Sequence, residues 1–220
     1  GDHGRFGVGL PKISDGQLLF QLNGISKLKD NGRMAIIHNG SALFSGAAGS
    51  GESEIRRYVI ENDWLDAIIQ LPNDVFYNTG ISTYVWIIDK DKKRHRQGRV
   101  QLIDASHMYE NRRKNIGSKR VDITEECRNV IVQAYGDFLN KEYNLGDRKA
   151  ESKVFDNLKF GFNKVTIESP LKDEAGNIIL KKKKPQADAS LRDTEDIPLT
   201  EDIDVYFERE IKPFNQDSWI

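Results

Sequence analysis

The order of three segments within residues 33–71 constrains the fold most. The apolar runs "RMAIIH" (33–38) and "LDAIIQL" (65–71) each have the length and composition of a buried strand. Between them, a helix is predicted at about 52–62, after the glycine-rich stretch "NGSALFSGAAGSG" (39–51). Two strands joined through a helix lie parallel in one sheet, connected by a right-handed crossover. The order therefore predicts an α/β fold.

The next predicted strand, at 81–88, is rich in β-branched and aromatic residues. Residues 72–80 are too few to hold another crossover helix, so we expect this strand to return antiparallel beside 65–71. A helix at 17–29 and a short strand at 99–106 complete this part of the prediction.

The second half of the chain differs in character from the first. An amphipathic helix is predicted at 122–140 and another at 199–214, where Pro213 closes it, with irregular segments between them. We therefore predict an α/β domain at 1–110 and, at 111–220, a mostly helical extension lying on it.

Composition restricts the class of protein. Charged residues make up 30% of the 220 residues, and no apolar run approaches the length of a membrane span, so we expect no membrane partner. The first residues do not have the pattern of a signal peptide. The single cysteine, Cys127, cannot form an internal disulfide and fits a reducing cytosol, which predicts a cytoplasmic protein.

Candidate ligand sites are weak at this level. The stretch "GAAGSGES" (46–53) lies between a strand and a helix, as phosphate-binding loops do, but it lacks the P-loop lysine and does not match G-x-G-x-x-G. A mobile surface loop is the favoured interpretation. No metal site is predicted, because metal-ligand spacing is absent from Cys127 and the four histidines, His3, His38, His95 and His107.

The net charge of −1 conceals a strong asymmetry along the chain. Residues 90–99, 111–120 and 181–184 are basic clusters, whereas 187–210 is mostly acidic. A solvated surface is the default interpretation of each cluster. The two basic clusters that flank one short strand also indicate a polyanion nearby.

The loop before the strand at 81–88 contains two adjacent large rings. In "LPNDVFYNTGISTYVWIIDK" (71–90), Phe76 and Tyr77 stand side by side among turn-forming residues. Either both rings close the end of the sheet, or at least one of them faces a ligand.

Several stretches together resemble the modification (methylation) subunit of type I restriction–modification systems. They cover nearly the whole chain in the same order, which makes the set more specific than any single motif. They are "GDHGRFGVGLPKISDGQLLFQ", "GRMAIIHNGSALFSGAAGSGESEIRRYVIENDWLDAIIQLP", "VFYNTGISTYVWIIDK", "VQLIDAS", "KVFDNLKFGFNKVTIESPL", "LRDTEDIPL" and "DIDVYFEREIKPFNQDSWI".

The resemblance implies an enzyme that transfers a methyl group from S-adenosylmethionine to N6 of adenine in DNA. Its implied partners are DNA, a specificity subunit and a restriction (nuclease) subunit. The strands at 33–38, 65–71 and 81–88 would be the last three of a Rossmann-like class I methyltransferase sheet, with 81–88 antiparallel.

The resemblance also implies a role for the aromatic loop. In related adenine methyltransferases, an aromatic side chain just before the antiparallel strand stacks on the flipped adenine. Phe76 falls at this place, with Tyr77 and Asn78 next to it, so these three residues are the predicted target-base site.

The resemblance implies two further motifs that the chain does not contain. The family's Asn/Asp-Pro-Pro-Phe/Tyr stretch and its glycine-rich cofactor motif belong upstream of Gly1, and no two prolines are adjacent here. We therefore expect a C-terminal part of a methylation subunit, without catalytic or cofactor-binding residues and inactive alone. The alternative is an interaction module in which 111–220 docks the specificity subunit. We also expect self-association through an uncovered edge at 33–38.

Overall fold

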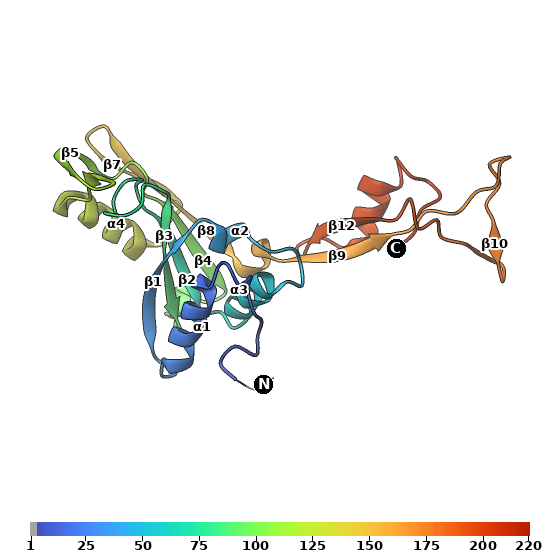
Figure 1. Ribbon diagram of the computed structural model, residues 1–220, viewed down its shortest axis with the longest axis horizontal. Coiled ribbons are helices and arrows are strands. Elements are labelled where there is room, and N and C mark those ends of the chain that lie inside the picture. Colours follow the sequence, from blue (N-terminus) through green and yellow to red (C-terminus); the bar gives the residue numbers. More distant parts are fainter. Residues whose placement is uncertain (1–3) are drawn as a thin grey trace. The chain divides into compact units, whose positions relative to one another are not determined.

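A computed structural model of the chain describes residues 4–220 (Figure 1). The chain divides into two compact units, Gly1–Asn157 and Leu158–Ile220. The expected boundary between 110 and 111 falls inside the first unit, because the central sheet takes strands from both sides of it.

The first unit is built on a six-stranded sheet with the order β1-β3-β2-β4-β8-β7. The predicted antiparallel return is confirmed: β3 lies between β1 and β2 and is antiparallel to both. β1 and β2 are therefore parallel to each other but not adjacent, and β2 pairs in parallel with β4. The strands are β1 (Arg33–Asn39), β2 (Leu65–Gln70), β3 (Thr83–Asp89), β4 (Arg99–Asp104), β7 (Lys141–Leu145) and β8 (Arg148–Asp156).

Helices cover both faces of this sheet. On one face, α1 (Gln17–Lys27) and α3 (Gly51–Glu61) bury apolar side chains in a cluster with Ile68 and Trp86. On the other face, α4 (Glu125–Asp137) packs in a second cluster that includes Ile69. Ile68 and Ile69 are consecutive on β2, and the alternation of side chains along a strand sends them to opposite faces.

The starts of α3 and α4 follow from side-chain caps. Ser50 accepts a hydrogen bond from the Ser53 amide at 3.3 Å, and Thr124 accepts one from the Cys127 amide at 3.3 Å. Such caps satisfy amides that have no partner inside the helix. The four-residue helix α2 (Ser41–Phe44) lies between β1 and α3.

The prediction of a mostly helical extension at 111–220 is wrong. Apart from α4, this half contains mainly strands and loops, with only short helical segments near its end. The cause is visible in β8, where buried Ala150 and Ser152 alternate with polar residues and give little apolar signal. The remaining elements are β5 (Glu110–Ile116), β6 (Lys119–Asp122), β9 (Phe162–Ile167), β10 (Leu180–Lys181), β11 (Lys184–Pro185), β12 (Asp193–Pro198), α5 (Ile203–Tyr206), a π-helical turn (Phe207–Ile211) and the 3₁₀ turns Arg94–Arg96 and Asn157–Phe160.

The second unit has a small core of its own. β9 and β12 pair antiparallel, and Val165, Ile167, Ile197 and Phe207 are buried. Asp202 caps α5 by accepting a hydrogen bond from the Val205 amide at 3.0 Å. Across residues 4–220, none of the helices combines the length and the apolar character that crossing a bilayer requires.

Candidate functional site

The loop between β2 and β3, residues 71–82, has a defined conformation. Its ends are closed where the Leu71 amide donates to the Thr83 carbonyl at 2.9 Å and the Ser82 hydroxyl donates to Asn73 Oδ1 at 2.8 Å. The middle of the loop thus projects from the sheet between fixed ends.

The β5–β6 hairpin supports this loop from one side. The Ser118 amide donates to the Tyr77 carbonyl at 2.8 Å, and the Arg120 amide donates to the Asp74 carbonyl at 2.9 Å. Gly117 has φ +59°, and a Cβ there would lie 2.5 Å from the Tyr77 carbonyl oxygen, so the close approach requires glycine. This hairpin was not predicted from the sequence, although Gly117 between two basic segments was a signal for it.

The two aromatic rings of the loop have different environments. Phe76 is partly buried and packs against the core cluster on the α4 face. Tyr77 is 58% exposed, and Lys119 Nζ lies 5.4 Å from the centroid of its ring. Asn78 follows as an exposed side chain. The loop therefore presents Tyr77 and Asn78 outward, while Phe76 contributes to the closure of the sheet end.

The hairpin beside the loop carries the basic cluster 111–120. Arg112 and Lys119 pair with Asp122 at 2.5 and 3.0 Å, and these hydrogen bonds, with Lys119 the larger cause, hold the pKa of the Asp122 carboxyl below its usual value. The side chains of the other three cations, Arg113, Lys114 and Arg120, are exposed and have no carboxylate or other hydrogen-bond acceptor among residues 4–220.

The basic cluster at 90–99 is different, and a fully solvated surface is the wrong interpretation for two of its members. Lys92 and Arg96 are buried and pair with Asp63 and Asp66 at 2.6 and 2.7 Å. These ion pairs have no direct signal in the sequence, because the two carboxylates precede their partners by about thirty residues.

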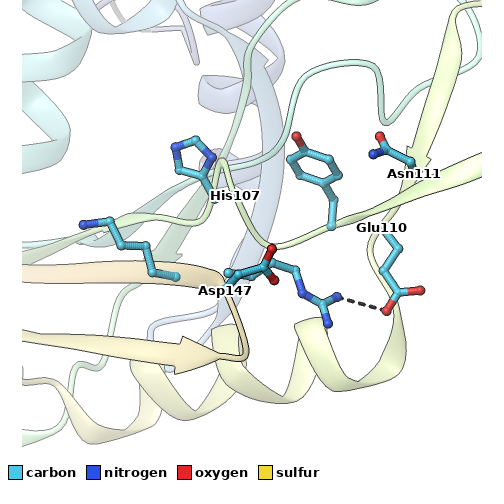
Figure 2. A pocket seen from close by; sticks show the side chains of 7 residues that line it. His107, Glu110, Asn111 and Asp147 are labelled. Carbon is cyan, nitrogen blue, oxygen red and sulfur yellow. Dashed lines mark hydrogen bonds and ion pairs between the residues drawn. The ribbon is translucent and has the colours of Figure 1, made fainter.

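A shallow groove of about 710 Å³ lies at the base of the hairpin (Figure 2). The arginine and the lysine that line it are already paired: Arg148 with Glu110 at 3.0 Å and Lys149 with Glu142 at 3.1 Å. The groove is therefore close to electrically balanced, in contrast to the outer part of the hairpin. It is lined by His107, Tyr109, Glu110, Asn111, Asp147, Arg148 and Lys149.

The glycine-rich stretch before α3 does not form an anion site. The main chain at Leu10 packs against Gly51, and the Glu52 carboxylate accepts a hydrogen bond from the Lys12 amide at 3.0 Å. This hydrogen bond is the largest cause of the lowered pKa of Glu52, so a negative charge already occupies the position that a phosphate would take.

Within the described part of the chain, histidine, cysteine, aspartate and glutamate side chains do not gather into groups that could hold a metal ion. His3 lies outside the described residues. His38 is buried, its Nε2 lies 2.8 Å from Gln21 Oε1, and burial lowers the pKa of its imidazole to about 4.

The sequence of the chain matches the profile of a known family. Residues 2–167 match N-6 DNA Methylase, which is more than half of the 220 residues. The chain belongs to this family.

The relatives of the chain identify its branch of the family, which confirms the resemblance described above. The MjaIX type I restriction enzyme methylase subunit of Methanocaldococcus jannaschii is 31% identical over 135 residues, covering 61% of this chain and 23% of that protein. The EcoKI methylase subunit of Escherichia coli is 29% identical over 126 residues, covering 56% of this chain and 23% of that protein. The chain thus spans about a quarter of the length of these relatives.

A solved structure supports the fold. The crystal structure of the type I restriction–modification methyltransferase subunit from Streptococcus thermophilus aligns with a TM-score of 0.60 at 27% identity. The alignment covers 72% of this chain and 31% of that structure. The mixed α/β architecture is therefore that of type I methyltransferase subunits.

Proposed function

We propose that this chain is part of a cytoplasmic type I methylation subunit that transfers methyl from S-adenosylmethionine to N6 of adenine in DNA, and that it supplies the loop that receives the target base. The observation that carries the proposal is the exposed Tyr77 ring, held in a braced loop at the end of β2. Family membership supports the type of reaction, and the loop supports the role of this chain in that reaction.

The sheet order supports the Rossmann-like class I part of the proposal. The resemblance implies that an antiparallel last strand follows two parallel ones, and β3 is antiparallel to β1 and β2 and lies between them. The loop 71–82 leads into this strand, at the place where the family's base-stacking aromatic is expected.

Energetics favour an exposed ring for this role. Flipping an adenine out of a duplex costs a few kcal/mol, and stacking on an aromatic side chain returns roughly 1–3 kcal/mol per base. Tyr77 offers an accessible ring next to the Asn78 amide, which is suited to hydrogen-bond a base edge. Phe76 remains a predicted platform as well, but its contacts with the core leave less of its ring for a base. We assign stacking to Tyr77 and the anchoring of the loop to Phe76.

A docking role is a second candidate for the rest of the chain. Residues 158–220 form a separate unit on which Val205 and Phe214 are 60% and 90% exposed. We propose that these two exposed apolar side chains contact a protein partner. A specificity subunit is the partner that the family resemblance implies, with the restriction subunit joining the same assembly.

The stacking proposal is tested with single-stranded oligonucleotides, which remove the cost of base flipping. Binding of the 220-residue chain to an adenine-containing strand is compared, by fluorescence anisotropy, with binding to the same strand carrying an abasic site. Tyr77→Ala should reduce the adenine-dependent difference by about 1–3 kcal/mol, and Tyr77→Phe should preserve it.

The matched control is Phe20→Ala, which removes a ring that is 72% exposed on α1, away from the loop. An unchanged adenine preference in Tyr77→Ala, or an equal loss in Phe20→Ala, contradicts the proposal. If Phe76→Ala instead removes the preference without lowering the urea midpoint, Phe76 is the platform and Tyr77 is not.

A further inference from the structure

The outer part of the β5–β6 hairpin is an uncompensated positive surface. Residues 111–120 contain five cations and no carboxylate. Asp122 neutralises part of this charge through Arg112 and Lys119. The other three side chains are exposed and without an acceptor among residues 4–220; they are those of Arg113, Lys114 and Arg120.

This surface is attached to the candidate base-binding loop by the main chain. The amides of Ser118 and Arg120 donate to the carbonyls of Tyr77 and Asp74, so the position of the loop and that of the hairpin are linked. Gly117 allows the turn of the hairpin to lie against the Tyr77 carbonyl. A ligand bound to the hairpin is therefore held at a fixed place relative to the Tyr77 ring.

We propose that Arg113, Lys114 and Arg120 bind the phosphate backbone of duplex DNA beside the target base and position the duplex against the 71–82 loop. The inference rests on the proposed function, because that function places a nucleic acid at Tyr77. Phosphate contacts set the register and orientation of a protein on DNA without reading its sequence. The three residues are thus positioning residues, not catalytic ones.

The other basic segments of the chain lack this combination of free charge and an adjacent aromatic loop. Lys92 and Arg96 are buried in ion pairs, and Arg148 and Lys149 are paired with glutamates. Residues 181–184 are exposed lysines, but they belong to the other compact unit. They provide a control with the same change in charge.

The test measures binding of a fluorescein-labelled 20-base-pair duplex by anisotropy over a series of salt concentrations. Each lost phosphate contact reduces the slope of log K against log salt concentration by roughly 1. We expect the variant Arg113→Gln/Lys114→Gln/Arg120→Gln to lose roughly 3 from the slope. The control Lys182→Gln/Lys183→Gln/Lys184→Gln, which also removes three positive charges, should lose less than about 1.

A charge-retaining variant separates a binding role from a folding role. Arg113→Lys/Arg120→Lys should keep the wild-type slope, since a phosphate contact needs a positive charge, and all variants should keep the wild-type far-ultraviolet circular dichroism. Equal losses in the hairpin variant and its control would overturn the inference. An unchanged slope in the hairpin variant would also overturn it. So would a wild-type chain whose binding to DNA does not depend on salt concentration, and that result would favour an acidic protein surface as the partner of the free cations.

The outcome is distinguishable from failure of the proposed function. The salt slope reports phosphate contacts, whereas the comparison of adenine and abasic strands reports base stacking. A hairpin-dependent slope without any adenine preference would leave the inference standing and remove the stacking role of the loop. An adenine preference without a hairpin-dependent slope would do the reverse.

Discussion

The buried guanidinium of Arg96 is the group whose loss should destabilise the first unit most among the ion-paired cations. Its side chain is 6% exposed, and it donates to Asp66 Oδ1 at 2.7 Å, where the Asp66 side chain is 0% exposed. It also donates to Gln101 Oε1 and the Tyr135 carbonyl, each at 3.0 Å, and lies 4.0 Å from the ring centroid of Phe138. Every polar face of the guanidinium therefore has a protein partner.

The size of the effect follows from what Arg96→Met leaves behind. The Asp66 carboxylate would remain buried. It would keep the hydrogen bond from the Tyr135 hydroxyl at 2.5 Å but lose the positive charge of Arg96. Removing one member of a buried pair costs about 3–5 kcal/mol, because the other charge is left uncompensated. With a urea m-value of about 2 kcal/mol/M, the unfolding midpoint should fall by roughly 2 M.

The assay is urea unfolding followed by tryptophan fluorescence. A Trp219→Phe background removes the tryptophan of the second unit and leaves Trp64 and Trp86 as probes of the first. The control is Arg57→Ala, which breaks exposed pairs with glutamates one turn away on α3 and should cost less than about 0.5 kcal/mol.

A double variant makes the reasoning refutable. Arg96→Met/Asp66→Leu removes both charges and should recover most of the loss, since replacing both members of a buried pair by apolar groups is often neutral. If Arg96→Met costs less than about 1 kcal/mol, or if the double variant is no more stable than the single one, the loss does not come from an uncompensated buried carboxylate.

Four further outcomes are expected. Burial lowers the pKa of His38 to about 4 from an ordinary 6.5, so the folded state disfavours its protonation. The free energy of unfolding, measured by urea titration, should therefore fall by about 2 kcal/mol between pH 6.5 and pH 5. The variant His38→Gln should not show this fall. Gly117→Ala should cost roughly 1–2 kcal/mol and speed hydrogen exchange at the Ser118 amide, since φ is +59°. Labelled methyl transfer to adenine-containing DNA should stay at background for this chain, because it has no adjacent prolines in an amide–Pro–Pro–aromatic motif; clear turnover would contradict this. Light scattering on dilution should reveal self-association through β1, the edge strand of the sheet; a monomer with rapidly exchanging amides at 33–39 would contradict it.

The strands β1, β2 and β3 could be predicted because their local sequences are typical of buried strands. β1, β2 and β3 are apolar runs bounded by turn residues, and the short connection between β2 and β3 leaves only an antiparallel return. What the sequence could not indicate is that β3 inserts between the other two. Strand order depends on contacts between distant segments, which local periodicity does not record.

The strands at the other edge of the sheet could not be predicted for a physical reason. β7 and β8 carry charged residues between their buried ones: β7 buries one large side chain, Tyr143, and β8 buries the small or polar Ala150 and Ser152. A strand that buries so little apolar area has a weak alternation, so the same letters suit an irregular segment. The aromatic loop was found, but which of its rings is exposed depends on the core beneath Phe76, which is assembled from distant elements.

The basic clusters 90–99 and 111–120 have similar compositions but different environments. Two cations of the first are buried in ion pairs, whereas three of the second are exposed and unpaired among residues 4–220. The difference lies in the carboxylates near each cluster in space. Asp66 is on β2, where the sheet and α4 exclude water. The negative charge of a buried carboxylate is compensated by a cation. Arg96 of the 90–99 cluster supplies this cation and is therefore buried. In the hairpin at 110–122, two of the five cations pair with Asp122, and the other carboxylate, Glu110, pairs with Arg148 outside the hairpin. The remaining charge of the hairpin has no internal use in the described chain. A cluster of cations thus indicates a polyanion partner only after the buried carboxylates within reach have been counted, and by that count the hairpin beside Tyr77 is the surface to test.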